Sequence, residues 1–316
     1  MRKRAWLIAL LILAPLVIGF AAPKVKVGVV YVTFSSPYAS AMVKGYQKYA
    51  KEMSIDMTIL DSQLDIQKES ANMDSIIAMK PDVIIIAPVD AEGSKAAIKK
   101  AIAKKIPVIC SNVTVTDAAK LGVLAFTGPN CYSEAEGVAR EAIKRNPTGN
   151  VVMITGTPGY SAAEDRKNGF LDTVMRQAPN MKILDIQSGN WMRDETQRVM
   201  SDFITKYGDQ ISIVYTHDDN MTVGAINALK DAGYTADNRP MILSIGAMAD
   251  GLPAVKDGWI DATCQQSPWE EARLSLQVAQ DIKSGKFKGP YKDFWIDTPS
   301  VDKNNVQKII DMHIWD

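Results

Sequence analysis

Continuous runs of Val and Ile alternate along the chain with stretches of helical periodicity, and this alternation restricts the fold more than any other feature. The runs include "VKVGVVYV" at 25–32, "DVIIIAP" at 82–88 and "NVVMITG" at 150–156. Strands that are apolar on both faces are typical of parallel sheets with helices packed on both sides. The sequence therefore predicts an α/β protein whose parallel strands are connected by helices.

The strand–helix pattern runs twice along the chain. The first round ends with a strand at 122–128, and the second begins with a helix at 131–145 and a strand at 150–156, with no long linker between them. Each round is about the size of one domain, and 316 residues exceed a typical single domain. We therefore expect two doubly wound parallel-sheet lobes.

The N-terminus has the layout of a secretory signal peptide. Basic residues at 2–4 precede an apolar run from Ala5 to Phe20, and residues 19–21 fit a small-residue cleavage site. An uncleaved membrane anchor is the alternative, since the run is nearly long enough to span a bilayer. Pro15 and the small residues at the end of the run favour cleavage. We expect removal of residues 1–21 and a mature protein that is periplasmic or extracellular.

Charge and short motifs argue against several classes of function. Lys and Arg total 36, as do Asp and Glu, so the chain has no net charge, and it has no basic stripe for nucleic acid. The sequence lacks a G-x-S-x-G elbow, a dinucleotide-binding fingerprint and metal-ligand spacing. We therefore expect a protein that is not an enzyme and that carries no cofactor and no metal.

Three cysteines, Cys110, Cys131 and Cys264, are far apart in the sequence and odd in number. Cys110 and Cys264 lie in apolar strand-like runs, which favours buried thiols. One disulfide between Cys110 and Cys131 is the alternative, because an exported protein can hold one.

Polar and aromatic side chains follow the predicted strands, where doubly wound sheets bind their ligands. They are Phe34, Ser36 and Tyr38, then Ser111 and Asn112, then Tyr160, Glu164 and Arg166, then Asn190 and Trp191, then His217, Asp218 and Asp219, and finally Gln266 and Trp269. Amides, carboxylates and a guanidinium group suit sugar hydroxyls, and aromatic rings suit the C–H faces of a sugar. This mixture favours a neutral polyhydroxy ligand.

Several of these segments, taken in order, resemble the periplasmic sugar-binding proteins of ABC importers, in the ribose-binding group. They include "SSPYASAMVKGYQKYA", "IIIAPVDAEG", "IPVICSN", "GTPGYSAAEDRKNGF", "YTHDDNMTVGAINAL" and "AVKDGWIDATCQQSP". The resemblance covers residues 24–316 and implies the type I periplasmic binding fold, in which two lobes are joined by a three-crossing hinge. The first lobe would comprise 24–127 plus 267–292, and the second 130–264 plus 293–316.

The resemblance also implies which residues contact the sugar. These are Ser36, Tyr38, Ser111, Asn112, Arg166, Trp191, Asp218, Gly246 and Gln266. Arg166, Trp191 and Gln266 fit the family, and Asp219 is expected to cap the helix after Asp218. The family's aspartate–arginine pair is replaced by Ser111 and Asn112, and its late aspartate by Gly246. These losses argue against ribose itself and leave another pentose, a hexose, a cyclitol or an open-chain polyol open.

The function that the resemblance implies is that of the solute-binding component of an ABC importer. Such a protein, here expected to be a monomer, delivers a small neutral carbohydrate or polyol to a permease in the membrane. A ligand sensor of the same fold that docks on a chemoreceptor or sensor kinase is the alternative. A repressor with this fold would need an N-terminal helix-turn-helix where this chain has an export signal.

Overall fold

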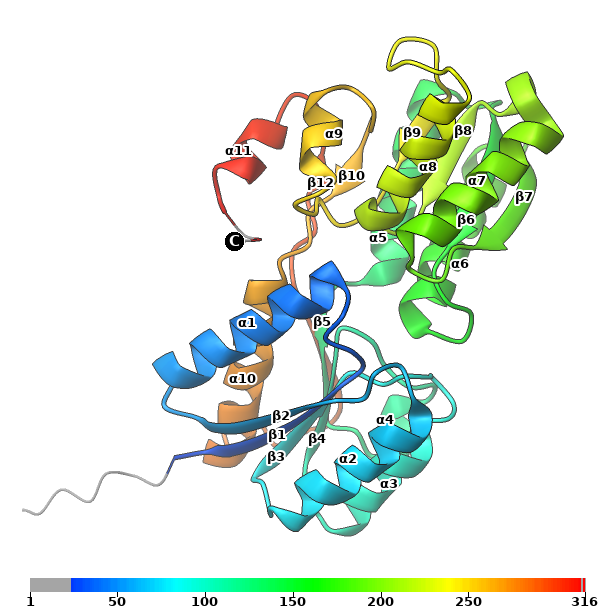
Figure 1. Ribbon diagram of the computed structural model, residues 1–316. Helices are drawn as coiled ribbons and strands as arrows, with labels where there is room; N and C mark the ends of the chain where they lie inside the picture. Colours follow the sequence, from blue (N-terminus) through cyan, green and yellow to red (C-terminus); the bar gives the residue numbers. More distant parts are fainter. Residues whose placement is uncertain (1–23, 314, 316) are drawn as a thin grey trace, which may run out of the picture.

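The computed structural model describes residues 24–313 and 315, which form two α/β lobes (Figure 1). The predicted signal peptide, residues 1–21, lies outside the described residues. Within the described part of the chain, no helix has the length and apolar content needed to cross a membrane.

The first lobe is a six-stranded sheet with helices on both faces. Its elements are β1 (Lys26–Tyr31), α1 (Pro37–Glu52), β2 (Asp56–Asp61), α2 (Ile66–Ala78), β3 (Val83–Ile86), α3 (Lys95–Ala103), β4 (Val108–Ser111), α4 (Ala118–Leu121), β5 (Ala125–Gly128), α10 (Pro268–Ser284) and β11 (Lys292–Trp295). The strand order is β11-β5-β4-β3-β1-β2, and all of these pairs are parallel.

The second lobe is built around a parallel four-stranded sheet of order β7-β6-β8-β9. Its elements are α5 (Cys131–Arg145), β6 (Asn150–Thr155), α6 (Ser161–Gln177), β7 (Lys182–Ser188), α7 (Arg193–Tyr207), a 3-10 turn (Gly208–Gln210), β8 (Ile213–Thr216), α8 (Asp219–Asp231), β9 (Met241–Leu243), α9 (Leu252–Lys256), β10 (Thr263–Cys264), β12 (Ser300–Val301) and α11 (Val306–Ile310). An antiparallel β10–β12 pair joins β9 through isolated bridges. The predicted pair of parallel-sheet α/β lobes is confirmed.

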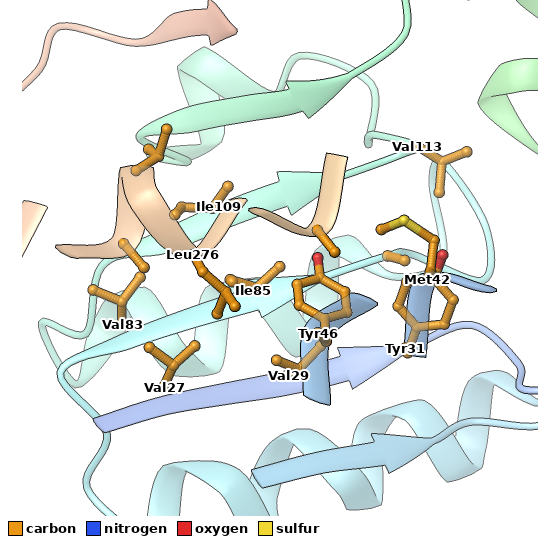
Figure 2. Close-up of a cluster of buried hydrophobic side chains, with 14 of the residues drawn as sticks. Val27, Val29, Tyr31, Met42, Tyr46, Val83, Ile85, Ile109, Val113 and Leu276 are labelled. Atoms are coloured by element: carbon orange, nitrogen blue, oxygen red, sulfur yellow. The ribbon is translucent and has the colours of Figure 1, made fainter. Parts of the chain in front are cut away.

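The central strands are buried on both faces, as their continuous Val and Ile runs predict. Val29 and Ile85 pack with Tyr46 of α1 on one face of the first sheet (Figure 2). Ile84 packs on the opposite face with Ile98 of α3. All five side chains have no exposed surface. Burying each of them contributes about 1.5–3 kcal/mol to the stability of the fold. The sheet is therefore a rigid support for the loops at its edge.

The boundary between the lobes differs from the expected division at one strand. The resemblance places residues from 293 onward in the second lobe, whereas β11 pairs with β5 in the first, with Asp293 opposite Phe126 and Trp295 opposite Gly128. The chain enters the second lobe after Trp295 and pairs there through β12. Strand composition does not say which sheet edge a strand joins, so this pairing could not be predicted from the sequence.

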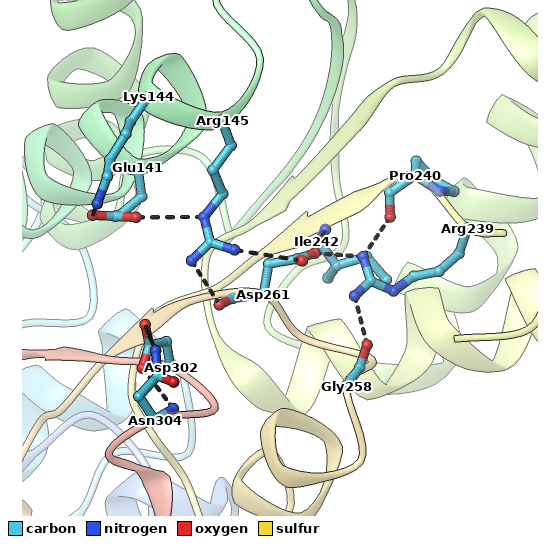
Figure 3. Close-up of polar contacts among 10 residues, drawn as sticks. All are labelled: Glu141, Lys144, Arg145, Arg239, Pro240, Ile242, Gly258, Asp261, Asp302 and Asn304. Atoms are coloured by element: carbon cyan, nitrogen blue, oxygen red, sulfur yellow. Dashed lines mark hydrogen bonds and ion pairs between the residues drawn. The ribbon is translucent and has the colours of Figure 1, made fainter. Parts of the chain in front are cut away.

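A polar cluster around Asp261 stabilises the second lobe (Figure 3). The Arg145 guanidinium lies 3.7 Å from its carboxylate, and Arg239 forms an ion pair with the same group. Arg239 also donates 2.6 Å to the carbonyl oxygen of Gly258. The carboxylate accepts 2.8 Å from the backbone N–H of Ile242 at β9. These contacts connect α5 to the segments on either side of α9.

The cysteines carry free thiols. Cys110, Cys131 and Cys264 are all buried, and none of them forms a disulfide. Burial raises the pKa of each thiol, which keeps it protonated. The predicted buried thiols are confirmed, and the alternative Cys110–Cys131 bridge is wrong.

Candidate functional site

The two lobes contact one another through the loops that follow their strands. The backbone N–H of Ala91 donates 3.2 Å to the carbonyl oxygen of Gly159, and that of Thr114 donates 3.0 Å to Oγ of Ser161. Gly159 has a φ of +83°, and a Cβ there would lie 2.7 Å from Oδ2 of Asp90. Glycine therefore lets the two lobes approach closely at this point.

Three of the predicted site residues converge on Glu271 of α10. Oη of Tyr38 donates 2.6 Å to its Oε2, and Nδ2 of Asn112 donates 3.2 Å to the same oxygen. Oγ of Ser111 donates 3.0 Å to Oε1. Glu271 has no exposed surface, and burial raises its pKa to about 7. This carboxylate is the centre of the first-lobe part of the site.

Sequence reasoning missed Glu271, although a signal was present. In α10 the buried face includes Glu271, Ala272, Ser275, Leu276 and Ala279. A carboxylate on the otherwise small and apolar face of an amphipathic helix has to be hydrogen-bonded inside the protein. The helical pattern alone could therefore have indicated that Glu271 is a buried polar centre.

Ser111 lies in the interior of the first lobe and has no exposed surface. Besides its bond to Glu271, its Oγ accepts 2.9 Å from Oη of Tyr46 and lies 3.2 Å from Oγ of Ser275. Ser275 is in turn 2.7 Å from Oγ1 of Thr127. Ser111 thus belongs to a chain of hydrogen-bonded hydroxyls in the lobe interior, and this chain ends at Glu271.

Ser36 stands apart from the Glu271 group. It is the N-cap of α1, where its Oγ accepts 3.1 Å from the backbone N–H of Ala39, and Pro37 occupies the first helical turn. A Ser cap followed by Pro is a favourable start for a helix. This start sets the position of Tyr38 in the first turn of α1.

In the second lobe, Arg166 and Gln266 converge on Glu134 of α5. Arg166 donates from Nε and Nη2 to Oε2 of Glu134, at 3.2 and 2.9 Å, and from Nη1 to the carbonyl oxygen of His217 at 2.7 Å. Nε2 of Gln266 donates 2.8 Å to Oε1 of Glu134. Burial raises the pKa of Glu134, and Arg166 opposes that rise. Sequence reasoning found the two donors and missed the carboxylate that holds them.

Trp191 forms an aromatic wall beside this ion pair. A Cβ on Gly156 would lie 2.1 Å from two of its ring atoms, so the indole rests directly on the Gly156 backbone. The ring centroid is 5.8 Å from that of Tyr160, and Cζ of Arg166 is 5.8 Å from the indole ring. Trp191 also packs against apolar clusters of both lobes, and its Nε1 is buried without a hydrogen-bond partner.

The roles expected for Asp218 and Asp219 are reversed in one respect. Asp218, not Asp219, is the N-cap of α8, and its carboxylate accepts 2.7 Å from the backbone N–H of Met221. Asp219 is fully buried and accepts from Ser244 and from Thr263. Asp218 has an extended backbone, with a φ of −152° and a ψ of 166°, and can therefore cap, whereas Asp219 is already the first helical residue. Burial raises the pKa of Asp218 to about 6 and that of Asp219 to about 7.

Gly246 contributes backbone groups next to Gln266. Its N–H donates 2.8 Å to the carbonyl oxygen of Cys264, and its carbonyl accepts 3.0 Å from the N–H of Gln266. Its φ is +127°, which favours glycine. Gly246 therefore holds the segment that carries Gln266 rather than supplying a side chain.

Trp315, near the C-terminus, is another residue that no motif marked. Its indole N–H donates 2.7 Å to the carbonyl oxygen of Ala247. Its ring packs edge-on against Tyr38, with centroids 5.9 Å apart. The C-terminal segment thus connects the second lobe to the first-lobe site residue Tyr38.

The two polar groups lie near one another across the junction. The charge of Glu134 contributes to the raised pKa values of both Glu271 and Tyr38, which places the second-lobe carboxylate within electrostatic reach of the first-lobe group. A pocket of about 200 Å³ lies where the chain crosses between the lobes, lined among others by Pro129, Asp293 and Trp295, and of the predicted contact residues it includes Asn112. Hydrogen-bonding groups of both lobes therefore approach the same junction, and the Trp191 and Tyr160 rings lie beside the second-lobe group.

Comparison with known proteins adds a family and several relatives. Residues 27–287 match the family described as periplasmic binding protein domain. The chain is 30% identical over 272 residues to the galactofuranose-binding protein of Escherichia coli, a match that covers 85% of each. It is 29% identical over 286 residues to the xylitol-binding protein of Mycolicibacterium smegmatis, covering 90% of this chain and 79% of that protein. The ribose import binding protein of Salmonella typhimurium is 29% identical over 286 residues, covering 90% of this chain and 94% of the relative.

Solved structures resemble the whole described fold. The crystal structure of a galactofuranose binding protein matches with a TM-score of 0.85 and 27% identity, covering 91% of this chain and 98% of that one. The periplasmic binding protein component of the arabinose ABC transporter from Shewanella sp. ANA-3, bound to α- and β-L-arabinofuranose, matches with a TM-score of 0.84 and 26% identity. That match covers 91% of this chain and 95% of the other.

Proposed function

The chain belongs to the family of periplasmic binding protein domains, and on that premise we propose that it binds a monosaccharide or a related polyol between its two lobes for an ABC importer. One observation carries the proposal. A buried polar group in each lobe, centred on Glu271 and on Glu134, reaches the same junction beside the Trp191 ring. A ligand with several hydroxyls can be held from both sides there.

The chemistry of the two groups supports a neutral polyhydroxy ligand. In the second lobe, Arg166 and Gln266 are hydrogen-bond donors. In the first lobe, Asn112 offers an amide, and Tyr38 offers a phenol whose O–H is hydrogen-bonded to Glu271. Hydroxyl groups both donate and accept, so a sugar can match such a mixed set. Three relatives are named as binding proteins for galactofuranose, xylitol and ribose, which supports the same class of ligand.

Binding between the lobes also gives a signal that a membrane partner can detect. A ligand that contacts both lobes stabilises the closed arrangement, whereas a ligand held by one lobe would shift nothing. We infer that the closed, loaded protein docks as a monomer on the permease, in the periplasm or outside the cell, after cleavage of the signal peptide. The protein performs no reaction on its ligand.

A thermal-shift screen tests this function. The mature chain is heated with D-ribose, L-arabinose, D-galactose, D-fructose, xylitol and myo-inositol, and with amino acids as the control class. A ligand at 100 times its Kd adds about 2.7 kcal/mol to the free energy of unfolding, so at least one sugar or polyol should raise Tm clearly. No shift with any of these carbohydrates, or shifts with amino acids alone, would contradict the proposal.

A further inference from the structure

We propose that Glu271 of α10 is a positioning residue that fixes Tyr38 and Asn112 for the ligand. The proposal deepens the proposed function and rests on it. Ser111, the last residue of β4, and Asn112 after it carry no charge. The structure brings a carboxylate to those two residues from a helix 159 residues away along the chain.

Glu271 collects hydrogen-bond donors from three parts of the first lobe. Its two oxygens accept from Tyr38 of α1, from Ser111 at the end of β4 and from Asn112 in the loop that follows. Segments that are distant in the sequence are thus held by one carboxylate. The resemblance implies ligand contacts at all three donors, and Glu271 contacts each of them.

Glu271 differs from Glu134 in its charge partner. In the second lobe, Glu134 pairs with Arg166 at 2.9 Å, whereas the ion pairs among the described residues do not include Glu271. A buried carboxylate held only by neutral donors costs free energy that an amide or an apolar side chain would not. A buried carboxylate of this kind lowers the stability of the fold, and we therefore infer that its charge serves ligand binding.

The hydrogen bonds to Glu271 also decide which atoms of its donors remain for a ligand. Because the O–H of the Tyr38 phenol donates its hydrogen bond to Glu271, the phenol oxygen is left as an acceptor. The Asn112 NH₂ group donates one of its two hydrogens to Glu271, which leaves its other N–H as a donor and its carboxamide oxygen as a second acceptor. With Glu271 ionised, the first-lobe face therefore offers more acceptors than donors for hydrogen bonds with ligand hydroxyls. Arg166 and Gln266 give the second-lobe face the opposite character.

Protonation of Glu271 reverses this arrangement. Burial raises its pKa to about 7, so it changes charge near neutral pH. The other titratable groups that face it are Tyr31, Tyr38, Tyr46, Tyr160, Cys131 and Glu134. Burial raises the pKa of each phenol and of the thiol, so these stay neutral at this pH. Ligand affinity should fall as the pH is lowered through the pKa of Glu271.

The first experiment measures affinity by calorimetry for D-ribose, L-arabinose, D-galactose and xylitol at about pH 6 and about pH 8. If only the ionised form binds, wild type loses about tenfold in affinity at the lower pH, in proportion to the ionised fraction. Glu271→Gln should bind weakly at both pH values. Glu69→Gln is the matched control, because Glu69 is equally buried in the same lobe but accepts from the backbone of Val89. Tight binding by Glu271→Gln with the wild-type pH profile would overturn the proposal.

The second experiment needs no ligand and so separates this proposal from the proposed function. In ¹⁵N–¹H NMR spectra of the free protein, the Asn112 side-chain NH₂ signals, assigned with an Asn112→Ser variant, should move with a midpoint near pH 7. Glu271→Gln should abolish this movement and Glu69→Gln should preserve it. If the signals move but no sugar binds, the hold of Glu271 on Asn112 stands and the proposed function fails. If the Asn112 signals do not move with pH, or move equally in Glu271→Gln, the proposal fails whether or not a sugar binds.

Discussion

Each lobe buries one glutamate at the junction, but the two carboxylates are stabilised in different ways. Glu134 of the second lobe is held by the forked guanidinium of Arg166 and by Gln266. Glu271 of the first lobe is held by a phenol, a hydroxyl and an amide. The first arrangement is an ion pair that needs both partners, and the second is a lone charge whose state depends on pH. The difference indicates that the carboxylate of the second lobe contributes to the stability of the fold, whereas the carboxylate of the first lobe serves ligand binding.

Loss of the cation in the second lobe should have the largest effect. Arg166→Ala leaves Glu134 buried without its partner, which should lower the free energy of unfolding by about 3–5 kcal/mol at neutral pH. Sugar affinity should fall at least tenfold, because the Arg166 group of donors is lost. Chemical denaturation and calorimetry measure the two effects. Arg176→Ala on the same helix is the control, since Arg176 is exposed and its ion pair with Glu136 is worth about 0–1 kcal/mol. Equal effects of the two variants would remove the ion pair from the account.

Removal of the lone charge in the first lobe should act in the opposite direction on stability. Because the pKa of Glu271 is raised to about 7 in the folded protein, the native state binds its proton more tightly than the unfolded chain. Its contribution to stability is therefore full at acid pH and is lost as pH rises through 7. Glu271→Gln should thus gain on the order of 3 kcal/mol over wild type between about pH 4.5 and about pH 8.

Urea denaturation of the ligand-free protein at both pH values measures this gain. Glu270→Gln is the neighbouring control, because Glu270 is exposed on the same helix and its change should leave the pH dependence as in wild type. A Glu271→Gln variant that is less stable than wild type at alkaline pH would show that the carboxylate belongs with Glu134 as a structural group.

The aromatic wall gives an effect of intermediate size. Gly156→Ala places a methyl group where the Trp191 ring lies, and such overpacking costs about 1–3 kcal/mol. The displaced ring should also lose its ligand-dependent tryptophan fluorescence change. Gly137→Ala is the control, because nothing lies within 4 Å of a Cβ there and alanine favours a helix interior by about 1 kcal/mol. An unchanged fluorescence response in Gly156→Ala would exclude Trp191 from the ligand wall.

The smallest effect is expected at the start of α1. Ser36→Ala removes the N-cap bond to Ala39 and should cost about 1 kcal/mol of stability. Affinity should change little if Ser36 acts through the helix and not on the ligand. Ser40→Ala, at an exposed position of the same helix, should change neither quantity. A large loss of affinity in Ser36→Ala alone would return Ser36 to the set of ligand contacts.

Much of the fold could be predicted because strand burial and helix periodicity are local properties of the sequence. The Val and Ile runs identified the central strands and the restart after residue 128, and the ordered motifs identified the family, which the match over 27–287 confirms. The sheet edge joined by Lys292–Trp295 was not predictable, because either lobe could accept a strand of that composition.

The residues of the candidate site also divide into those that the sequence indicated and those that it did not. Arg166 and Gln266 were found because they belong to ordered motifs, and the structure brings them together on Glu134. Glu134 was missed because its partners are distant in the sequence, and Glu271 was missed although its place on the buried face of α10 marked it. The N-cap of α8 is Asp218 and not Asp219, and this followed from backbone geometry that residue types alone do not specify.

The most direct test of the central claim is a crystal structure of the mature chain with the carbohydrate that most raises its Tm. The account predicts that the sugar lies between the lobes, with hydrogen bonds to Tyr38 or Asn112 on one side and to Arg166 on the other, and with Trp191 against it. A sugar bound to one lobe alone, or at a distance from these residues, would contradict the account.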